Sequence, residues 1–214
     1  MGYSSGKNGF KYLEILAVLY VASLLIADTI AVKVITIFGY PIPAGILCFP
    51  ISYIINDVLT EVYGFKNARR IIIYGFFCLA LMVLLYSISS ELKPASFWLH
   101  QEAFSTVFSF VPRIALGSLI AYLAGSLLNS YFMVIIKKMT NGKYLWIRTI
   151  GSTIIGEGVD SLIFYTVAFA GIFRFRDLII IILTGWILKT IYEIIATPFT
   201  YLVIYKLKQI EFGS

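Results

Sequence analysis

The sequence predicts an all-α polytopic membrane protein, with six transmembrane helices in one bundle. Its 214 residues are 60% hydrophobic and only 13% charged, whereas soluble domains carry about 25% charged residues. The mean hydropathy is +0.91, so there is too little polar surface to cover a water-soluble globule. The apolar residues come in long runs rather than short alternating strands, which favours helices over a transmembrane barrel.

Six apolar runs are long enough to cross the hydrocarbon core of a membrane, which is about 30 Å thick and needs about 20 helical residues. A helix satisfies its own backbone hydrogen bonds, as lipid requires. The whole chain, residues 1–214, is predicted to form one transmembrane domain. The predicted spans are about 12–33, 42–63, 70–90, 113–136, 148–172 and 178–205.

The second span is interrupted by proline. Pro50 lies well inside the run 42–63, and a proline has no backbone N–H to donate, so we expect a kink or a break there. Broken helices at membrane depth often form solute or ion sites. A kink that neighbouring helices simply pack against is the equal alternative.

The loop after the third span, residues 91–112, is the longest and is rich in aromatic residues. Its FWLHQEAFSTVFSF stretch is predicted to form an amphipathic helix at the outer interface, or one that folds back over the bundle. His100 lies in this stretch. We expect a solvated or interfacial histidine, with a proton-handling role as the alternative.

The fourth span carries small or polar residues at every fourth position, which places them on one helix face. Such a face lets another helix approach closely. Packing within the chain is the favoured interpretation, and a homodimer interface is the alternative. The residues are Gly117, Ala121, Gly125 and Asn129.

Lysine and arginine are distributed unequally between the two sides of the predicted bundle. Eleven flank the spans on the side that carries both termini, and four lie on the other side. The positive-inside rule therefore predicts that both termini are cytoplasmic. Because these charges lie between apolar runs, the net charge of +6 reflects orientation in a lipid bilayer, and no nucleic-acid partner is expected.

Several charges fall inside the predicted spans. A charge at the centre of a spanning helix costs about 2.5–3.5 kcal/mol on insertion scales, so each needs a partner, water or a bound solute. Lys33 lies at the end of its span and can reach the interface. The acids are Asp28, Asp57, Glu61, Glu157, Asp160 and Glu193, and Lys189 is the other basic residue.

Spans two, five and six carry polar residues three or four positions apart, so that each pair shares a helix face. We expect these faces to converge on one interior site. Buried salt bridges that only hold the helices together are the alternative. A buried carboxyl that binds a proton would make protons the coupling ion. The pairs are Asp57 with Glu61, Glu157 with Asp160, and Lys189 with Glu193.

Several stretches resemble the queuosine precursor transporter family, six-span membrane proteins that are also called vitamin-uptake-transporter-like. The resemblance implies a bacterial inner-membrane importer of 7-deazaguanine bases, in their nitrile or aminomethyl form. It places Asp57 and Glu61 in a first acidic motif and Glu157 and Asp160 in a second. It also covers Gln101, Arg113 and Glu193, which we count with the four acids of these motifs as candidate substrate-binding residues. The matching stretches are AVKVI, PAGILCFPISYIINDVLTEVYGFKNARR, PRIALGSLIAYLAG, GKYLWIRTIGSTIIGEGVDSLIF and YEIIATPFTYLVIYKLK.

A purine-like base would give the surplus acids a partner. Its ring N–H and exocyclic amine are adjacent donors, which one carboxylate accepts together. We expect Asp57 and Glu157 to bind the base, and Asp160 and Glu61 to gate the path or carry protons. Lys189 would neutralise Glu193 or another acid. Candidates for the carbonyl edge are Asn56, Gln101 and Asn129, and candidates for stacking on the ring are Tyr53, Phe164, Trp186 and Tyr192.

Two other classes of function are open to the sequence. An intramembrane enzyme could use Asp57 and Asp160 as an aspartyl pair, although the chain has no HExxH or GxSxG motif. A substrate-binding subunit of a larger energised complex would need a partner ATPase, because no Walker A motif is present. Another purine-like or vitamin-like solute is a further alternative. No catalytic residue, cofactor or metal site is predicted.

Overall fold

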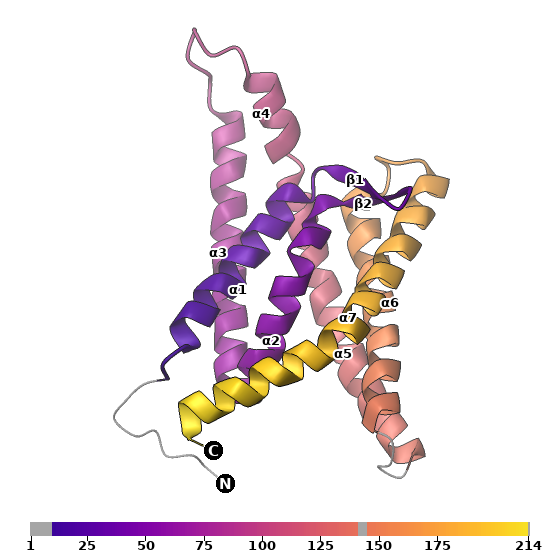
Figure 1. The fold of residues 1–214 in the computed structure, drawn as a ribbon. Helices are drawn as coiled ribbons and strands as arrows, with labels where there is room; N and C mark the ends of the chain where they lie inside the picture. Colours follow the sequence, from indigo (N-terminus) through magenta and orange to yellow (C-terminus); the bar gives the residue numbers. More distant parts are fainter. Residues whose placement is uncertain (1–9, 141–144, 214) are drawn as a thin grey trace.

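The computed structural model describes residues 10–140 and 145–213, and most of these are helical (Figure 1). A short two-stranded sheet and a 3-10 helix, η1, lie between the first two helices. The elements in chain order are α1 (Leu13–Ile30), β1 (Val34–Ile37), β2 (Tyr40–Pro43), η1 (Ala44–Leu47), α2 (Phe49–Tyr63), α3 (Phe65–Glu91), α4 (Gln101–Phe108), α5 (Val111–Met139), α6 (Leu145–Phe169) and α7 (Phe175–Phe212).

Six of these helices, all except α4, overlap the six predicted spans. By length and composition, four segments of the described chain can cross a membrane: Leu13–Ile30, Lys66–Glu91, Gln101–Gly125 and Phe175–Phe212. With 15 residues, α2 is about 22 Å long and shorter than the hydrocarbon core. The α6 helix carries two acids, Glu157 and Asp160, which lower its hydropathy.

The all-α prediction misses a β-hairpin, which occupies the predicted loop between the first two spans and the first two residues of the predicted second span. Val34 pairs with Pro43 and Ile37 with Tyr40, which leaves a two-residue turn. Both turn residues, Phe38 and Gly39, have positive φ values, of 51° and 85°. This conformation is typical of tight hairpin turns, because its twist matches that of the strands.

The second span is broken near Pro50, as predicted, but the break lies just before the proline. The 3-10 helix η1 ends at Leu47 and α2 begins at Phe49, with Cys48 between them. Pro50 is in the first turn of α2, where a backbone N–H has no acceptor within the helix, so the N–H that proline lacks is not missed. The prediction that the second span begins at residue 42 is therefore wrong, because Ile42 and Pro43 belong to β2.

The helices form two groups, with α7 in contact with both. In one group α1, α2 and α3 pack on one another, and in the other α5 packs along α6. The α7 helix contacts α6 and α2 (Figure 1). On α5, a Cβ added at Gly125 would lie 2.9 Å from the Cβ of Asp160, and one at Gly117 would lie 3.2 Å from the carbonyl oxygen of Phe164. The small-residue face of α5 is therefore used for packing within the chain, which confirms the favoured interpretation.

The first and last described residues, Phe10 and Gly213, lie at the same end of the molecule, which is called the terminal-bearing end here (Figure 1). The α2–α3 junction, the end of α5 and the start of α6 lie at this end as well, whereas α4 and the hairpin lie at the opposite end (Figure 1). The basic residues at the start of α3, Lys66, Arg69 and Arg70, and those near the end of α7, Lys206 and Lys208, therefore share the terminal-bearing end. His100 is exposed just before α4.

Glu211 ties the two ends of the chain together. Its carboxylate accepts hydrogen bonds from the backbone N–H groups of Lys11 (2.9 Å) and Tyr12 (2.8 Å) and from the Tyr63 hydroxyl (2.9 Å). Tyr12 precedes α1 and has no side-chain cap of its own, so Glu211 satisfies the open donors at the start of that helix. Phe10 packs edge-on against Tyr63 and Phe212. These contacts close the terminal-bearing end.

We expect Glu211→Gln to destabilise the protein by about 1–2 kcal/mol, because it removes the charge from three hydrogen bonds. Glu211 lies beyond the predicted span 178–205. Partial burial opposes its ionisation, but the hydrogen bonds from Lys11, Tyr12 and Tyr63 outweigh this, so its pKa is lowered. The stabilisation is therefore present at neutral pH and is lost as the pH falls through the lowered pKa.

Thermal unfolding in detergent at pH 7 and pH 4 measures this effect. The difference between wild type and Glu211→Gln should shrink at the lower pH. Glu91→Gln, at the exposed end of α3, is the matched control. Equal unfolding temperatures for wild type and Glu211→Gln at pH 7 would show that the tie contributes nothing.

Candidate functional site

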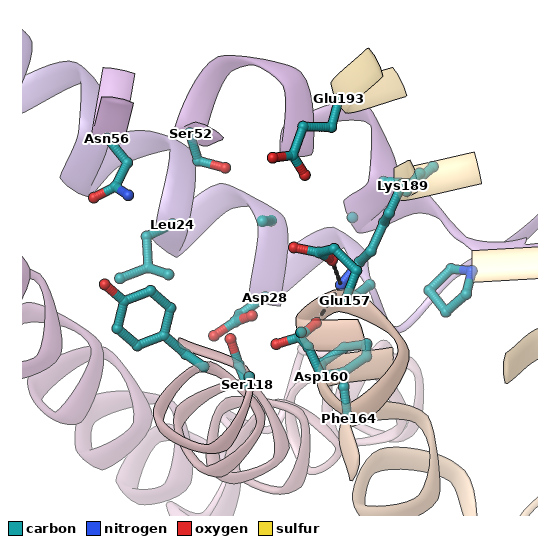
Figure 2. Close-up of a pocket in the computed structure, with 18 of the residues that line it drawn as sticks. Leu24, Asp28, Ser52, Asn56, Ser118, Glu157, Asp160, Phe164, Lys189 and Glu193 are labelled. Atoms are coloured by element: carbon teal, nitrogen blue, oxygen red, sulfur yellow. Dashed lines mark hydrogen bonds and ion pairs between the residues drawn. The ribbon is translucent and has the colours of Figure 1, made fainter. Parts of the chain in front are cut away.

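A cavity of about 280 Å³ lies among the helices (Figure 2). It is lined by residues of α1, the β2–η1–α2 segment, α5, α6 and α7. The lining residues are Tyr20, Leu24, Ala27, Asp28, Ala31, Pro43, Gly45, Ile46, Ser52, Asn56, Asp57, Ser118, Tyr122, Gly125, Thr153, Gly156, Glu157, Asp160, Phe164, Tyr165, Lys189 and Glu193.

One side of the cavity holds a buried ionic group. The Lys189 ammonium forms an ion pair and a hydrogen bond with Asp160, and its Nζ lies 3.6 Å from Oε2 of Glu157 (Figure 2). Lys189 is only 8% exposed and Glu157 only 7%. Glu157 and Asp160 share a face of α6 because they are three residues apart, and Lys189 reaches them from α7. This is the convergence of two helices that the sequence predicts.

Glu193 lies one helical turn after Lys189 and also faces the cavity. Its Oε1 accepts a hydrogen bond of 3.1 Å from the Thr153 hydroxyl of α6, whereas its Oε2 has no hydrogen-bond partner among the described residues. Asp57 of α2 is exposed at the edge of the cavity. It and Glu193 also line a second, much smaller pocket of about 10 Å³ between α2 and α7. The carboxylates of Asp57 and Glu193 therefore lie between the cavity and the smaller pocket.

The wall made by α1 and α5 carries a further acid. Asp28 is 4% exposed, and the Ser118 hydroxyl of α5 hydrogen-bonds to its carboxylate. Figure 2 shows the two side chains beside each other, apart from the Lys189 group. Within the described part of the chain, Asp28 Oδ2 has no hydrogen-bond partner. Tyr20 and Tyr122 line the cavity from the same two helices.

Small residues and one aromatic residue set the shape of the cavity. A Cβ at Gly45 would lie 2.7 Å from the carbonyl oxygen of Ala27, so η1 can lie directly against α1. The buried Tyr165 ring lies directly over Gly185 of α7, where there is no room for a Cβ. Phe164, one of the predicted stacking residues, does line the cavity.

Apart from the stacking candidates Phe164 and Tyr192, twelve residues were predicted for the site, and six of them line this cavity. They come from three helices, α2, α6 and α7, as expected from their spacing. The side chains of Tyr53 and Asn129 lie outside the described part of the structure. The six residues are Asn56, Asp57, Glu157, Asp160, Lys189 and Glu193.

Four predicted residues lie elsewhere and have other contacts. The Glu61 side chain is 61% exposed and lies 3.6 Å from the Lys208 ammonium, near the terminal-bearing end. Gln101 donates to the carbonyl oxygen of Ser90 (3.1 Å) and to the Ser105 hydroxyl (3.1 Å). Both residues were expected to meet the substrate, but neither lines the cavity.

Arg113 and Trp186 hold helices together instead of facing the cavity. Arg113 of α5 donates to the carbonyl oxygens of Val167 (2.6 Å) and Ala170 (2.5 Å) at the end of α6, where it satisfies acceptors that a helix end leaves open. The Trp186 indole N–H donates to the carbonyl oxygen of Ile154 (2.9 Å), and its ring lies against Gly158. Neither residue lines the cavity.

Some lining residues are missing from the predicted site. Asp28 is recognisable as an acid within a predicted span, and this cost of burial is the signal that could have added it to the site. Ser52, Ser118 and Thr153 carry no such signal, because hydroxyl residues are common in membrane helices and can bond to their own backbone. Only the packing of the helices against one another brings these three residues to the cavity.

The chain matches known transporters. Residues 43–203 match the family described as "Putative vitamin uptake transporter". A "Probable queuosine precursor transporter" of Bacillus subtilis (strain 168) is 31% identical over 176 residues, which cover 82% of this chain and 77% of the relative. The "Queuosine precursor transporter" of Escherichia coli (strain K12) is 30% identical over 135 residues, 63% of this chain and 58% of the relative.

A third relative, the "Probable queuosine precursor transporter" of Haemophilus influenzae (strain ATCC 51907 / DSM 11121 / KW20 / Rd), is 29% identical over 135 residues, 62% of this chain and 54% of the relative. The chain thus spans little more than half the length of two of the three relatives. No solved structure matches it at comparable stringency. Because the family match covers most of the chain, the protein belongs to the vitamin uptake transporter family, a family of membrane transporters and not of enzymes.

Proposed function

We propose that this protein imports queuosine precursors, 7-deazaguanine bases in their nitrile or aminomethyl form, into the bacterial cytoplasm. The observation that carries the proposal is the cavity, where carboxylates from four helices surround a space of about 280 Å³. This volume is just below the range of about 300–1,000 Å³ for drug-sized ligands, so it suits one bicyclic base. The names of the three relatives support the choice of substrate.

In this proposal the acceptor atoms of the cavity bind the donor edge of the base. Glu157 and Asp57 accept the ring N–H and the exocyclic amine, because a carboxylate can take two adjacent donors. Lys189 holds Asp160 and Glu157 in position through the contacts described above. Phe164 is the aromatic residue of the predicted set that is available for stacking on the ring.

The proposed arrangement in the inner membrane has six crossing helices in one bundle, with both termini in the cytoplasm. The basic residues at the terminal-bearing end support this orientation. It places α4 at the outer interface, between the third and fourth spans. Access would alternate around the cavity, with Asp57 and Glu193 on the path toward the cytoplasm, since they also line the smaller pocket.

Uptake of labelled base by a strain that depends on imported precursor tests the proposal. We expect Asp57→Asn and Glu157→Gln each to lower uptake at least tenfold while folded protein remains in the membrane. Asp177→Asn, an exposed acid at the start of α7, is the matched control and should take up base normally. Wild-type uptake by both cavity variants would remove the proposed roles.

Purified protein in liposomes distinguishes a self-sufficient carrier from a binding subunit that needs a partner ATPase. Uptake by the protein alone is expected for a self-sufficient carrier. Uptake that rises with an imposed proton gradient would identify protons as the coupling ion, which the surplus of acids in the cavity favours. No uptake by a protein that still binds the base would favour a binding subunit of a larger complex.

A further inference from the structure

The charges that line the cavity do not balance. Five carboxylates face it, and Lys189 is the one basic side chain among the described lining residues. Lys189 contacts Asp160 and Glu157, and among the described residues the other three carboxylates have no cation partner. They are Asp28, Asp57 and Glu193.

Asp28 differs from the other two in its surroundings. Asp57 is exposed at the edge of the cavity, and Glu193 is partly exposed and accepts a hydrogen bond from Thr153. Asp28 is 4% exposed, and it forms no ion pair with any residue that the structure describes. Its Oδ2 atom lacks a hydrogen-bond partner among the same residues. Because a buried carboxylate without a partner is costly, a carboxyl group in this state either holds a proton or binds a cation.

The surroundings of Asp28 suit a positively charged group. The Ser118 hydroxyl bonds to the carboxylate and leaves Oδ2 available to a donor. Tyr20 and Tyr122 line the cavity from the same two helices, and aromatic faces attract cations. A primary ammonium carries three donors and a charge, and its hydrogen bond to a carboxylate is among the strong ones.

We infer that Asp28 determines specificity within the cavity by binding a cationic substituent of the base, a primary ammonium group. This inference rests on the proposed function. The acceptors near α2, α6 and α7 take the ring donors, and Asp28 takes the charged substituent from the wall formed by α1 and α5. The protein therefore binds the aminomethyl base more tightly than the nitrile base, whose substituent has neither charge nor donor.

Equilibrium binding of the two bases to detergent-purified protein tests this inference. Wild-type protein is expected to bind the aminomethyl base at least tenfold more tightly than the nitrile base. Asp28→Asn should weaken binding of the aminomethyl base at least tenfold and change binding of the nitrile base less than threefold. Asp28→Glu, which keeps the charge, should restore part of the preference. Asp177→Asn is the isosteric control at an exposed position.

The outcomes separate this inference from the proposed function. Equal affinity of the wild type for both bases would overturn the role of Asp28 but leave the base as substrate. An equal loss of affinity for both bases in Asp28→Asn would also overturn the role of Asp28. If wild-type protein bound neither base, the proposed function would fail as well. Asparagine has the shape of aspartate without the charge, so the variant should fold, and the wild-type preference can be measured without any variant.

Discussion

Lys189→Met is expected to destabilise the protein by about 3–5 kcal/mol and to abolish binding of the base. Breaking a buried ion pair by removing one partner leaves the other charge without compensation, which accounts for a cost of this size. Here two carboxylates, Asp160 and Glu157, would lose their shared cation. Their side chains are only 15% and 8% exposed, so water cannot replace the ammonium. Thermal unfolding in detergent measures the stability, and equilibrium binding measures the site.

A triple variant separates folding from binding. Lys189→Met combined with Asp160→Leu and Glu157→Met contains no charge in this group, and replacing a buried ionic group with hydrophobic residues of similar size is often close to neutral for stability. We expect it to unfold near the wild-type temperature and still not bind the base. If Lys189→Met alone were as stable as wild type, the ionic group would not be buried as described.

Gly185→Ala is expected to destabilise the protein by about 1–3 kcal/mol, the usual cost of overpacking a core. The sign is opposite to helix propensity, which favours alanine over glycine by about 1 kcal/mol in a helix interior. The added methyl would overlap the ring and hydroxyl of Tyr165. Tyr165 is 2% exposed and packs in a core cluster with Phe169 and Ile181, so it has little room to move. Because Tyr165 lines the cavity, binding of the base should weaken too.

Gly75→Ala on α3 is the matched control for this change. A Cβ at Gly75 would lie 3.3 Å from Cδ2 of Leu24, a flexible methyl group that can shift by a few tenths of an ångström. We expect this variant to be as stable as wild type or slightly more stable. If Gly185→Ala were as stable as Gly75→Ala, the close contact between Tyr165 of α6 and Gly185 of α7 would be contradicted. Thermal unfolding and binding of the base again provide the measurements.

The helices could be predicted from sequence because each is a long apolar run, but the hairpin could not. The strand residues Val34–Ile37 are all apolar or β-branched, so apart from Lys33 they continue the hydrophobic pattern of the first span. The Phe38–Gly39 turn is a weak signal, because its first residue is a large aromatic where Asn or Asp is usual. The run 42–63 likewise conceals the change from strand to 3-10 helix to α-helix.

The site could be predicted where helix geometry alone decides which residues share a face. Glu157 and Asp160 face Lys189 as their spacing indicates. Arg113 and Trp186 could not be placed correctly, because their partners are backbone carbonyls of another helix, and such acceptors leave no trace in a sequence. Asp28, in contrast, was not predicted for the site but lines the cavity, because its position there depends on how α1 packs on α5.

Protection of a single cysteine by bound base tests most directly whether this cavity is the binding site. Ser52 lines the cavity, so Ser52→Cys would place a thiol there once Cys48 and Cys78 have been replaced. Ser96→Cys, in the exposed loop before α4, is the control. At a saturating concentration, the 7-deazaguanine base should slow maleimide labelling at position 52 and leave labelling at position 96 unchanged. Unchanged labelling at position 52, in protein that demonstrably binds the base, would contradict the account.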